Sequence, residues 1–167
     1  TLAQDKISNF CANYGREGID LMVVGIGEDG QIGFNEPGSL ANSNTRLVQL
    51  SYHTRKVQAE FFNGLSKTPK MAITMGLNTI MEAKRIIMMA WGENKAAIIR
   101  RVVEGEVSPQ IPASILQRHA DIEAVIDEGA ASQLTRVQTP WLVGPCEWTP
   151  KFVRKAVVWL CNVVKKP

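Results

Sequence analysis

The chain of 167 residues is 45% hydrophobic and 21% charged and holds 13 glycines, which describes one globular domain with a sizeable core. Its net charge of +3 is modest, so nucleic acid is not an expected partner, whereas small anionic substrates are. No stretch is long and apolar enough to span a bilayer and the opening is not signal-like, so we expect no membrane partner and a cytoplasmic location.

The predicted elements alternate between helices and strands. A helix is expected over Leu2–Asn13, and the apolar run Ile19–Gly25 suits a strand buried on both faces of a parallel sheet. Further strands are expected near residues 46–51, 71–75, 85–91 and 122–127, and further helices near 54–65, 76–83, 93–104 and 112–119. This alternation favours an α/β fold with a mostly parallel sheet and helices on both faces.

The segment 25–37 (GIGEDGQIGFNEP) follows the first strand and is the most informative part of the chain. In open α/β sheets, ligands bind where the loops at the carboxyl ends of the strands diverge. Asp29 and Glu36 are both predicted to face that crevice. The segment therefore predicts a ligand site with two carboxylates beside a glycine-lined turn.

Two other interpretations of the segment remain open. The spacing of Gly25, Gly27 and Gly30 fits a dinucleotide-binding turn, but residues 45–52 offer no acid for a ribose hydroxyl, and residues 35–38 (NEPG) break the helix that should follow. The plainer alternative is a glycine turn with incidental acids.

At these residues the sequence resembles the glucosamine-6-phosphate deaminase/isomerase family, whose signature reads GxGxDGHIAFNEP. The similarity covers most of residues 15 to about 135 and includes the segments 70–76 (KMAITMG) and 92–96 (GENKA). The resemblance implies a three-layer α/β/α fold. It also implies conversion of glucosamine 6-phosphate to fructose 6-phosphate and ammonia, and we expect no cofactor.

The resemblance assigns catalytic roles to Asp29, Gln31 and Glu36. Opening a cyclic amino sugar needs a group that takes the anomeric proton and returns it to the ring oxygen. In the family this group is a histidine held by the aspartate and the glutamate of the signature, whereas this chain has Gln31 there. An amide hydrogen-bonds but does not shuttle a proton, and losing a general acid or base costs roughly 10²–10⁴-fold in rate. The substitution predicts impaired deamination in a pocket that is kept.

The expected substrate-binding residues are Gly27, Gly30, Asn35 and Lys95. Lys95 is placed in the first turn of a predicted helix, where a lysine and backbone amides seat an anion, although a solvated helix lysine fits the position too. Glu60 precedes a Phe-Phe pair where the family has an arginine, and it would repel a phosphate unless it points away.

Several other residues are weighed and set aside. Arg46 matches an effector-site arginine of allosteric family members, but it equally suits a residue that opens a strand. His53 and His119 are interpreted as structural, and two histidines without a cluster give no metal site. Cys11, Cys146 and Cys161 are scattered and odd in number, which is typical of reduced, mostly buried thiols.

We divide the chain into residues 1–138, the C-terminal part of a deaminase-like domain, and residues 139–167, an extension rich in proline and tryptophan. Thr149 and Pro150 are predicted to start an amphipathic helix. It would pack on the core or a neighbouring domain, or else bind a partner or a membrane surface.

The family's proton-transferring aspartate and a second phosphate loop would lie before Thr1. The expected partners are therefore a phosphorylated amino sugar, the remainder of the same polypeptide, and further copies of the chain in a homo-oligomer. The alternatives are a non-catalytic sugar-phosphate sensor and a related sugar-phosphate isomerase or lactonase.

Overall fold

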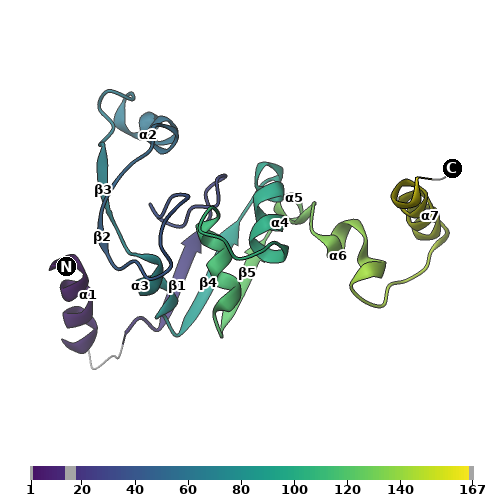
Figure 1. Cartoon of the computed structure of the whole chain (residues 1–167), viewed down its shortest axis with the longest axis horizontal. Helices are drawn as coiled ribbons and strands as arrows, with labels where there is room; N and C mark the ends of the chain where they lie inside the picture. The colour runs from purple at the N-terminus through teal and green to yellow at the C-terminus, as the bar shows by residue number, and fades with distance from the viewer. Residues whose placement is uncertain (1, 14–17, 166–167) are drawn as a thin grey trace.

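The computed structural model describes residues 2–13 and 18–165, and a three-stranded parallel sheet lies at its centre (Figure 1). The sheet has the order β1-β4-β5, with β1 over Leu21–Gly25, β4 over Arg85–Ala90 and β5 over Ile122–Ile126. Gly25 lies opposite Met89 in the register of β1 and β4. The α/β class with a mostly parallel sheet is thus confirmed.

Only one face of β1 is buried, so the expectation of a strand buried on both faces is wrong. Exposure alternates along the strand: Val24 is 6% exposed, whereas Leu21 is 50% and Val23 is 54% exposed. Successive side chains of a strand point to opposite faces. In the described residues, the hydrophobic core lies against the face that carries Met22 and Val24, and the other face is open.

Three helical segments supply the partners of the buried face. They are α3 (Leu77–Met81), α4 (Ala96–Glu104) and the 3-10 helix η3 (Pro112–Arg118). Ile99, Val102 and Leu116 from α4 and η3 are almost fully buried and join Ile86 and Met88 of β4 in one core cluster. Because this packing sets the position of β1 and β4, it also sets the position of the loops that follow them.

The strands β2 (Arg46–Gln49) and β3 (Met71–Thr74) form a separate antiparallel ribbon. Between them run α2 (Tyr52–Gln58) and the 3-10 helix η1 (Ala59–Phe62), which ends at Asn63 in a left-handed conformation. The sequence predicted both strands and a helix between them. Their pairing could not be predicted, since alternation of apolar residues is the same in parallel and antiparallel strands.

The remaining predicted helices are confirmed with changed limits. Helix α1 spans Leu2–Asn13, and the helix expected near 93–104 starts as the 3-10 helix η2 (Glu93–Lys95) before it continues as α4. Short segments follow β5, namely α5 (Glu128–Ala131), α6 (Thr135–Gln138) and η4 (Pro140–Leu142).

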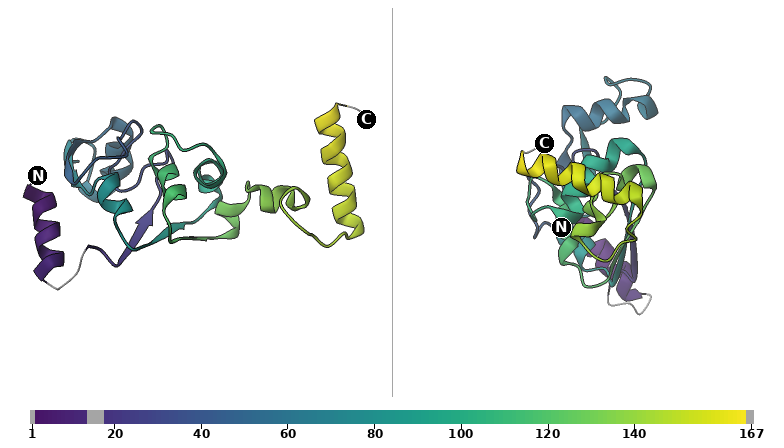
Figure 2. Two further views of the ribbon diagram at one scale, coloured as in Figure 1. Left: turned by 60° about the horizontal axis from the view of Figure 1, so that its bottom comes forward. Right: turned by 90° about the vertical axis from the view of Figure 1, so that its right-hand side faces the viewer.

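The last helix, α7 (Pro150–Val164), begins as the sequence predicts. The hydroxyl of Thr149 accepts a hydrogen bond from the Phe152 amide at 3.3 Å, and Pro150 occupies the first helical turn. Both views that show the length of the molecule place α7 at the opposite end from α1, beyond α6 and away from the sheet (Figures 1 and 2). Packing of α7 on the core of this chain is therefore excluded.

Among the described residues, no helix combines the length and apolarity needed to cross a membrane. Cys11, Cys146 and Cys161 are free thiols, and each is half-buried rather than mostly buried.

The open face of the sheet gives a matched test. Val24→Ala should lower the free energy of unfolding of this chain by about 2 kcal/mol, because it removes buried methyl groups and leaves a cavity. Val23→Ala, one residue earlier on the open face, should cost less than about 0.5 kcal/mol. Urea unfolding followed by circular dichroism measures both, and equal losses would contradict the one-sided core.

Candidate functional site

A tight turn directly after β1 brings Asp29 and Gln31 together. The Gly27 amide donates to the Gln31 carbonyl at 2.9 Å, and the Gly30 amide donates to the Gly27 carbonyl at 3.0 Å. The Asp29 carboxylate accepts a hydrogen bond from the backbone amide of Gln31 at 3.0 Å. Two of the three predicted catalytic residues therefore share one turn at the carboxyl end of the sheet.

Gly27 is needed in this turn because both side chains lie over its backbone. A Cβ atom at position 27 would come within 2.8 Å of the Asp29 Oδ1 atom and closer still to the Gln31 side chain. Real Cβ atoms do not approach other atoms so closely, so the absence of a side chain at Gly27 is what lets the carboxylate and the amide sit side by side.

The Gln31 side chain has one buried polar atom to which the structure gives no partner. Its Oε1 atom is inaccessible to solvent, and no hydrogen bond to it occurs in the part of the chain that the structure describes. A buried acceptor without a donor costs free energy unless a donor reaches it. Because this atom is covered, a ligand donor reaches it only if the Gln31 side chain turns outward.

Lys95 lies beside the same turn, in η2. Its ammonium group donates to the Ile26 carbonyl at 2.8 Å, while the Asn94 side-chain amide donates to Glu28 at 2.6 Å. Gly92, with a positive φ of 87°, makes the bend after β4 that directs η2 toward the turn. The half-buried Lys95 thus brings a cation to the edge of the sheet that carries Asp29 and Gln31.

Asp127 fixes the bend before Lys95, a role that the sequence analysis did not assign. Both of its carboxylate oxygens accept a hydrogen bond from the Gly92 amide at 3.0 Å, and one also accepts from the Ala130 amide at 2.8 Å. The end of β5 therefore holds the loop that follows β4. The signal was available, since aspartate directly before a helix is a common N-cap.

Asn35, predicted to bind substrate, is fully buried and joins three parts of the structure. Its amide nitrogen donates to the Ile32 carbonyl at 3.0 Å and to the Met75 carbonyl at 2.7 Å. Its amide oxygen accepts a hydrogen bond from Arg46 at 2.8 Å. Asn35 and Arg46 together tie the segment 25–37 to the β2-β3 ribbon, and a contact of Asn35 with substrate stays a prediction.

Glu36 contacts the start of α2. Its carboxylate accepts hydrogen bonds from the Ser51 amide at 3.1 and 3.2 Å and from the Thr54 hydroxyl. Ser51 also caps α2, because its hydroxyl accepts from the Thr54 amide at 3.1 Å. Glu36 therefore anchors α2 to the segment 25–37, and within residues 2–13 and 18–165 none of its hydrogen bonds joins it to Asp29 or Gln31.

Gly30, also predicted to bind substrate, faces the interior. It has a positive φ of 83°, and a Cβ atom there would lie 2.7 Å from Ile111 and 3.1 Å from Ile98. The Gly30 carbonyl accepts a hydrogen bond from the Ala113 amide at 2.9 Å. Gly30 thus lets η3 and α4 pack under the turn, and a role in substrate contact stays a prediction.

Two surface hollows lie near these elements. One, of about 610 Å³, is lined by Glu36, Ser39, Arg46 and neighbouring residues, so it adjoins the predicted site.

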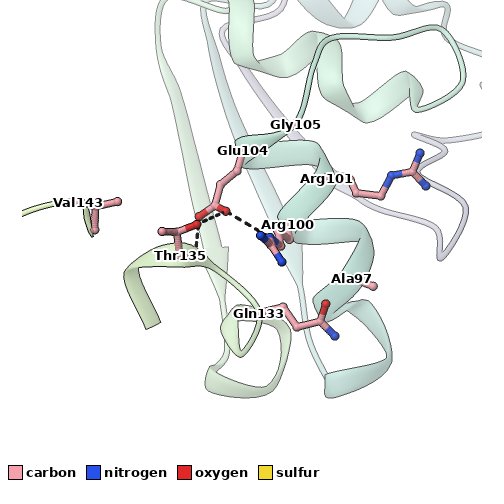
Figure 3. A pocket seen from close by; sticks show the side chains of 8 residues that line it. All are labelled: Ala97, Arg100, Arg101, Glu104, Gly105, Gln133, Thr135 and Val143. Atoms are coloured by element: carbon pink, nitrogen blue, oxygen red, sulfur yellow. Dashed lines mark hydrogen bonds and ion pairs between the residues drawn. The ribbon is translucent and has the colours of Figure 1, made fainter. Parts of the chain in front are cut away.

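Another, of about 700 Å³, lies between α4 and the segment after α5 and is lined by Arg100, Arg101 and Gln133 (Figure 3). Within it the Glu104 carboxylate accepts hydrogen bonds from the amide and the hydroxyl of Thr135, each at 2.7 Å, which ties α6 to α4. None of the predicted site residues lines this second hollow.

The structure also places the two histidines and Glu60. His119 lies within 2.7 Å of the Ala83 carbonyl and 3.0 Å of the Asp121 carbonyl, contacts that fit a structural role, whereas His53 is an exposed residue of α2. Glu60 is exposed in η1. Across residues 2–13 and 18–165, no group of three histidine, cysteine, aspartate or glutamate side chains is arranged to hold a metal ion.

The fold and the turn define an α/β protein with polar side chains at the carboxyl ends of parallel strands. Residues 2–126 match the model of the family described as glucosamine-6-phosphate isomerases/6-phosphogluconolactonase, and the chain belongs to this family.

Several proteins that are similar in sequence are named glucosamine-6-phosphate deaminase or deaminase-like protein. A glucosamine-6-phosphate deaminase-like protein of Bacteroides thetaiotaomicron is 47% identical over 172 residues, which cover 100% of this chain and 26% of that protein. The glucosamine-6-phosphate deaminase of Rhodopirellula baltica is 48% identical over 119 residues, which cover 71% of this chain and 47% of that protein. The chain therefore spans about half, or less, of the length of these relatives.

Solved structures agree on the fold. A monomeric glucosamine-6-phosphate deaminase superimposes with a TM-score of 0.70 and 38% identity, over 78% of this chain and 53% of that chain. The 6-phosphogluconolactonase of Trypanosoma cruzi reaches a TM-score of 0.57 at 18% identity, over 79% of this chain and 49% of that chain, which shows a shared fold alone.

The space above Gly27 can be tested with a second glycine as control. Gly27→Ala should lower the free energy of unfolding by about 1–3 kcal/mol, because the new methyl group collides with Asp29 and Gln31. Gly25→Ala should change it by less than about 0.5 kcal/mol, since no atom lies within 4 Å of a Cβ there. Chemical unfolding measures both, and a neutral Gly27→Ala would show that the turn has room to spare.

Proposed function

We propose that the complete polypeptide converts glucosamine 6-phosphate to fructose 6-phosphate and ammonia. The observation that carries the proposal is the 44–48% identity to proteins named glucosamine-6-phosphate deaminase, over aligned stretches of 118–133 residues. The reaction joins an aldose to ketose isomerisation to hydrolysis of the carbon–nitrogen bond. It needs ring opening, transfer of a proton from C2 to C1, and addition of water at C2 with loss of ammonia.

Within that reaction we assign ring opening to the turn after β1. Asp29 orients the turn by accepting from the Gln31 backbone amide, and the unpartnered Gln31 Oε1, which is buried, would accept a hydrogen bond from a sugar hydroxyl after the side chain turns outward. This contact holds the hydroxyl but takes no proton from it, since an amide is not a base near neutral pH. Ring opening at Gln31 is therefore expected to be slower than at a histidine.

Lys95 supplies the charge for the phosphate in this proposal. Its ammonium group lies at the edge of the sheet near Ile26, and it has two further donor positions beyond its bond to that carbonyl. Glu36 acts through α2, since its carboxylate is held by Ser51 and Thr54. We therefore interpret Glu36 as a positioning residue in this chain, and a direct catalytic role would require it to leave those partners.

The open face of the sheet supports the view that the domain is completed by other residues. Leu21, Val23 and Val125 are 50%, 54% and 39% exposed there, and the chain spans 47% of its relative from Rhodopirellula baltica. We propose that the rest of the domain covers this face and brings the proton-transferring group for the C2 to C1 step. Homo-oligomeric assembly, a cytoplasmic location and the division at residue 138 remain predictions.

A second candidate function is a sensor that binds the sugar phosphate without turning it over. Gln31 is the observation that favours it, because the residue keeps hydrogen bonding and lacks a titratable group. Calorimetry with glucosamine 6-phosphate, run beside an ammonia assay, separates the sensor from the deaminase. A sensor binds the sugar phosphate and releases no ammonia. A lactonase or isomerase acting on another sugar phosphate would instead show turnover without dependence on the amino group.

Gln31→His in the complete polypeptide should raise the rate of ammonia release at least tenfold, because it restores a group that titrates near neutral pH. Gln31→Met, similar in size and without polar atoms to pair, should give no gain and weaker binding. Asp29→Asn should lower whatever turnover exists. An enzymatic ammonia assay measures all three, and equal rates in every variant would mean that this turn does not open the ring.

A further inference from the structure

Helix α7 is held on one side by a cluster of aromatic rings. The ring of Trp141 lies 5.6 Å from that of Phe152 and 5.9 Å from that of Trp159, centroid to centroid, and both contacts are edge-to-face. Trp148 lies 6.3 Å from Trp141 and joins the cluster. Phe152 and Trp159 are seven residues apart, so one side of the helix is occupied by the extension itself.

A second side of α7 is apolar and open. Val153, Val157, Leu160 and Val164 follow one another at spacings of four, three and four residues, which places them in one stripe along the helix. They are 45%, 54%, 51% and 49% exposed. We call these four residues the outer stripe.

Two of the charged side chains of α7 lie away from the outer stripe. Lys151 and Lys155 lie on the opposite side of the helix, given a turn of 100° per residue, and Arg154 lies about 90° from the centre of the stripe. The stripe is thus a separate apolar surface rather than the edge of a solvated face. Contiguous exposed apolar surface of this kind marks an interaction site.

The spacing of the stripe also indicates what covers it. Alternating steps of three and four residues form the seam along which two helices pack side by side. The sheet of this chain is not that partner, because α7 lies away from it in both lengthwise views (Figures 1 and 2). The stripe is therefore suited to a partner helix, and the sheet of this chain does not cover it.

We propose that the outer stripe of α7 docks against a helix from another folded part of the same polypeptide, outside these 167 residues. The relative from Bacteroides thetaiotaomicron matches the whole chain, including residues 139–167, and this match accounts for 26% of its length. The deaminases that this chain matches over about half their length align with 71–78% of it, and the family model ends at residue 126. Among these relatives, residues 139–167 are thus matched in the protein of which this chain covers the smallest share.

Two other occupants are distinguishable from this one. A second copy of the chain would place two stripes together, and its docking would depend on protein concentration. A membrane surface would take the stripe only when lipid is present. Both are outcomes of the test below and would overturn the proposal.

The test is amide hydrogen exchange on the complete polypeptide. Val157→Asp should speed exchange at least tenfold in α7 and also in one segment outside residues 1–167, because both helices lose their shared contact. Lys155→Asp introduces the same side chain on the opposite side of α7. It should leave the rate of amide exchange in that outside segment unchanged. Exchange that is unaltered outside residues 1–167 in Val157→Asp would refute the docking.

A milder variant separates lost docking from a damaged helix. Val157→Ala raises intrinsic helix propensity while it shortens the side chain, so faster exchange in the outside segment would come from lost contact. Light scattering on the same samples identifies self-association, and a dimer that Val157→Ala turns into a monomer would assign the stripe to a second copy instead. Protection of α7 that arises only with vesicles of anionic lipid would assign it to a membrane.

Discussion

The buried amide of Asn35 is the interaction on which the arrangement of the site depends. A buried amide is costly unless its donors and acceptor are paired, and here the Ile32 and Met75 carbonyls and the Arg46 guanidinium pair them. These partners come from the segment 25–37, from the residue after β3 and from β2. One side chain thus fixes the ribbon against the loop that follows β1, and with it α2 and the carboxylate of Glu36.

The local elements could be predicted from the sequence because their signals are local. The apolar runs gave all five strands to within two residues, and Thr149 and Pro150 gave the start of α7. The features that could not be predicted depend on distant partners. The antiparallel pairing of β2 with β3 follows from contacts across more than twenty residues, and the burial of each face of β1 depends on which distant residues pack against it.

The candidate site shows the same division. The signature pointed to Asp29 and Gln31, and the turn does bring them together over Gly27. It could not show that Glu36 is held by Ser51 and Thr54, fifteen and eighteen residues away, or that Gly30 faces Ile98 and Ile111. In each case a residue of the signature serves a packing or anchoring need that only the folded chain defines.

The proposed function depends on Gln31, which forms hydrogen bonds but lacks the titratable group that ring opening needs. The most direct test is ammonia release from glucosamine 6-phosphate by the complete polypeptide, with the 167-residue chain as the blank. We predict slow release with equimolar fructose 6-phosphate from the complete polypeptide and none from this chain. Binding of the sugar phosphate without any release of ammonia would contradict the enzymatic account and favour the sensor.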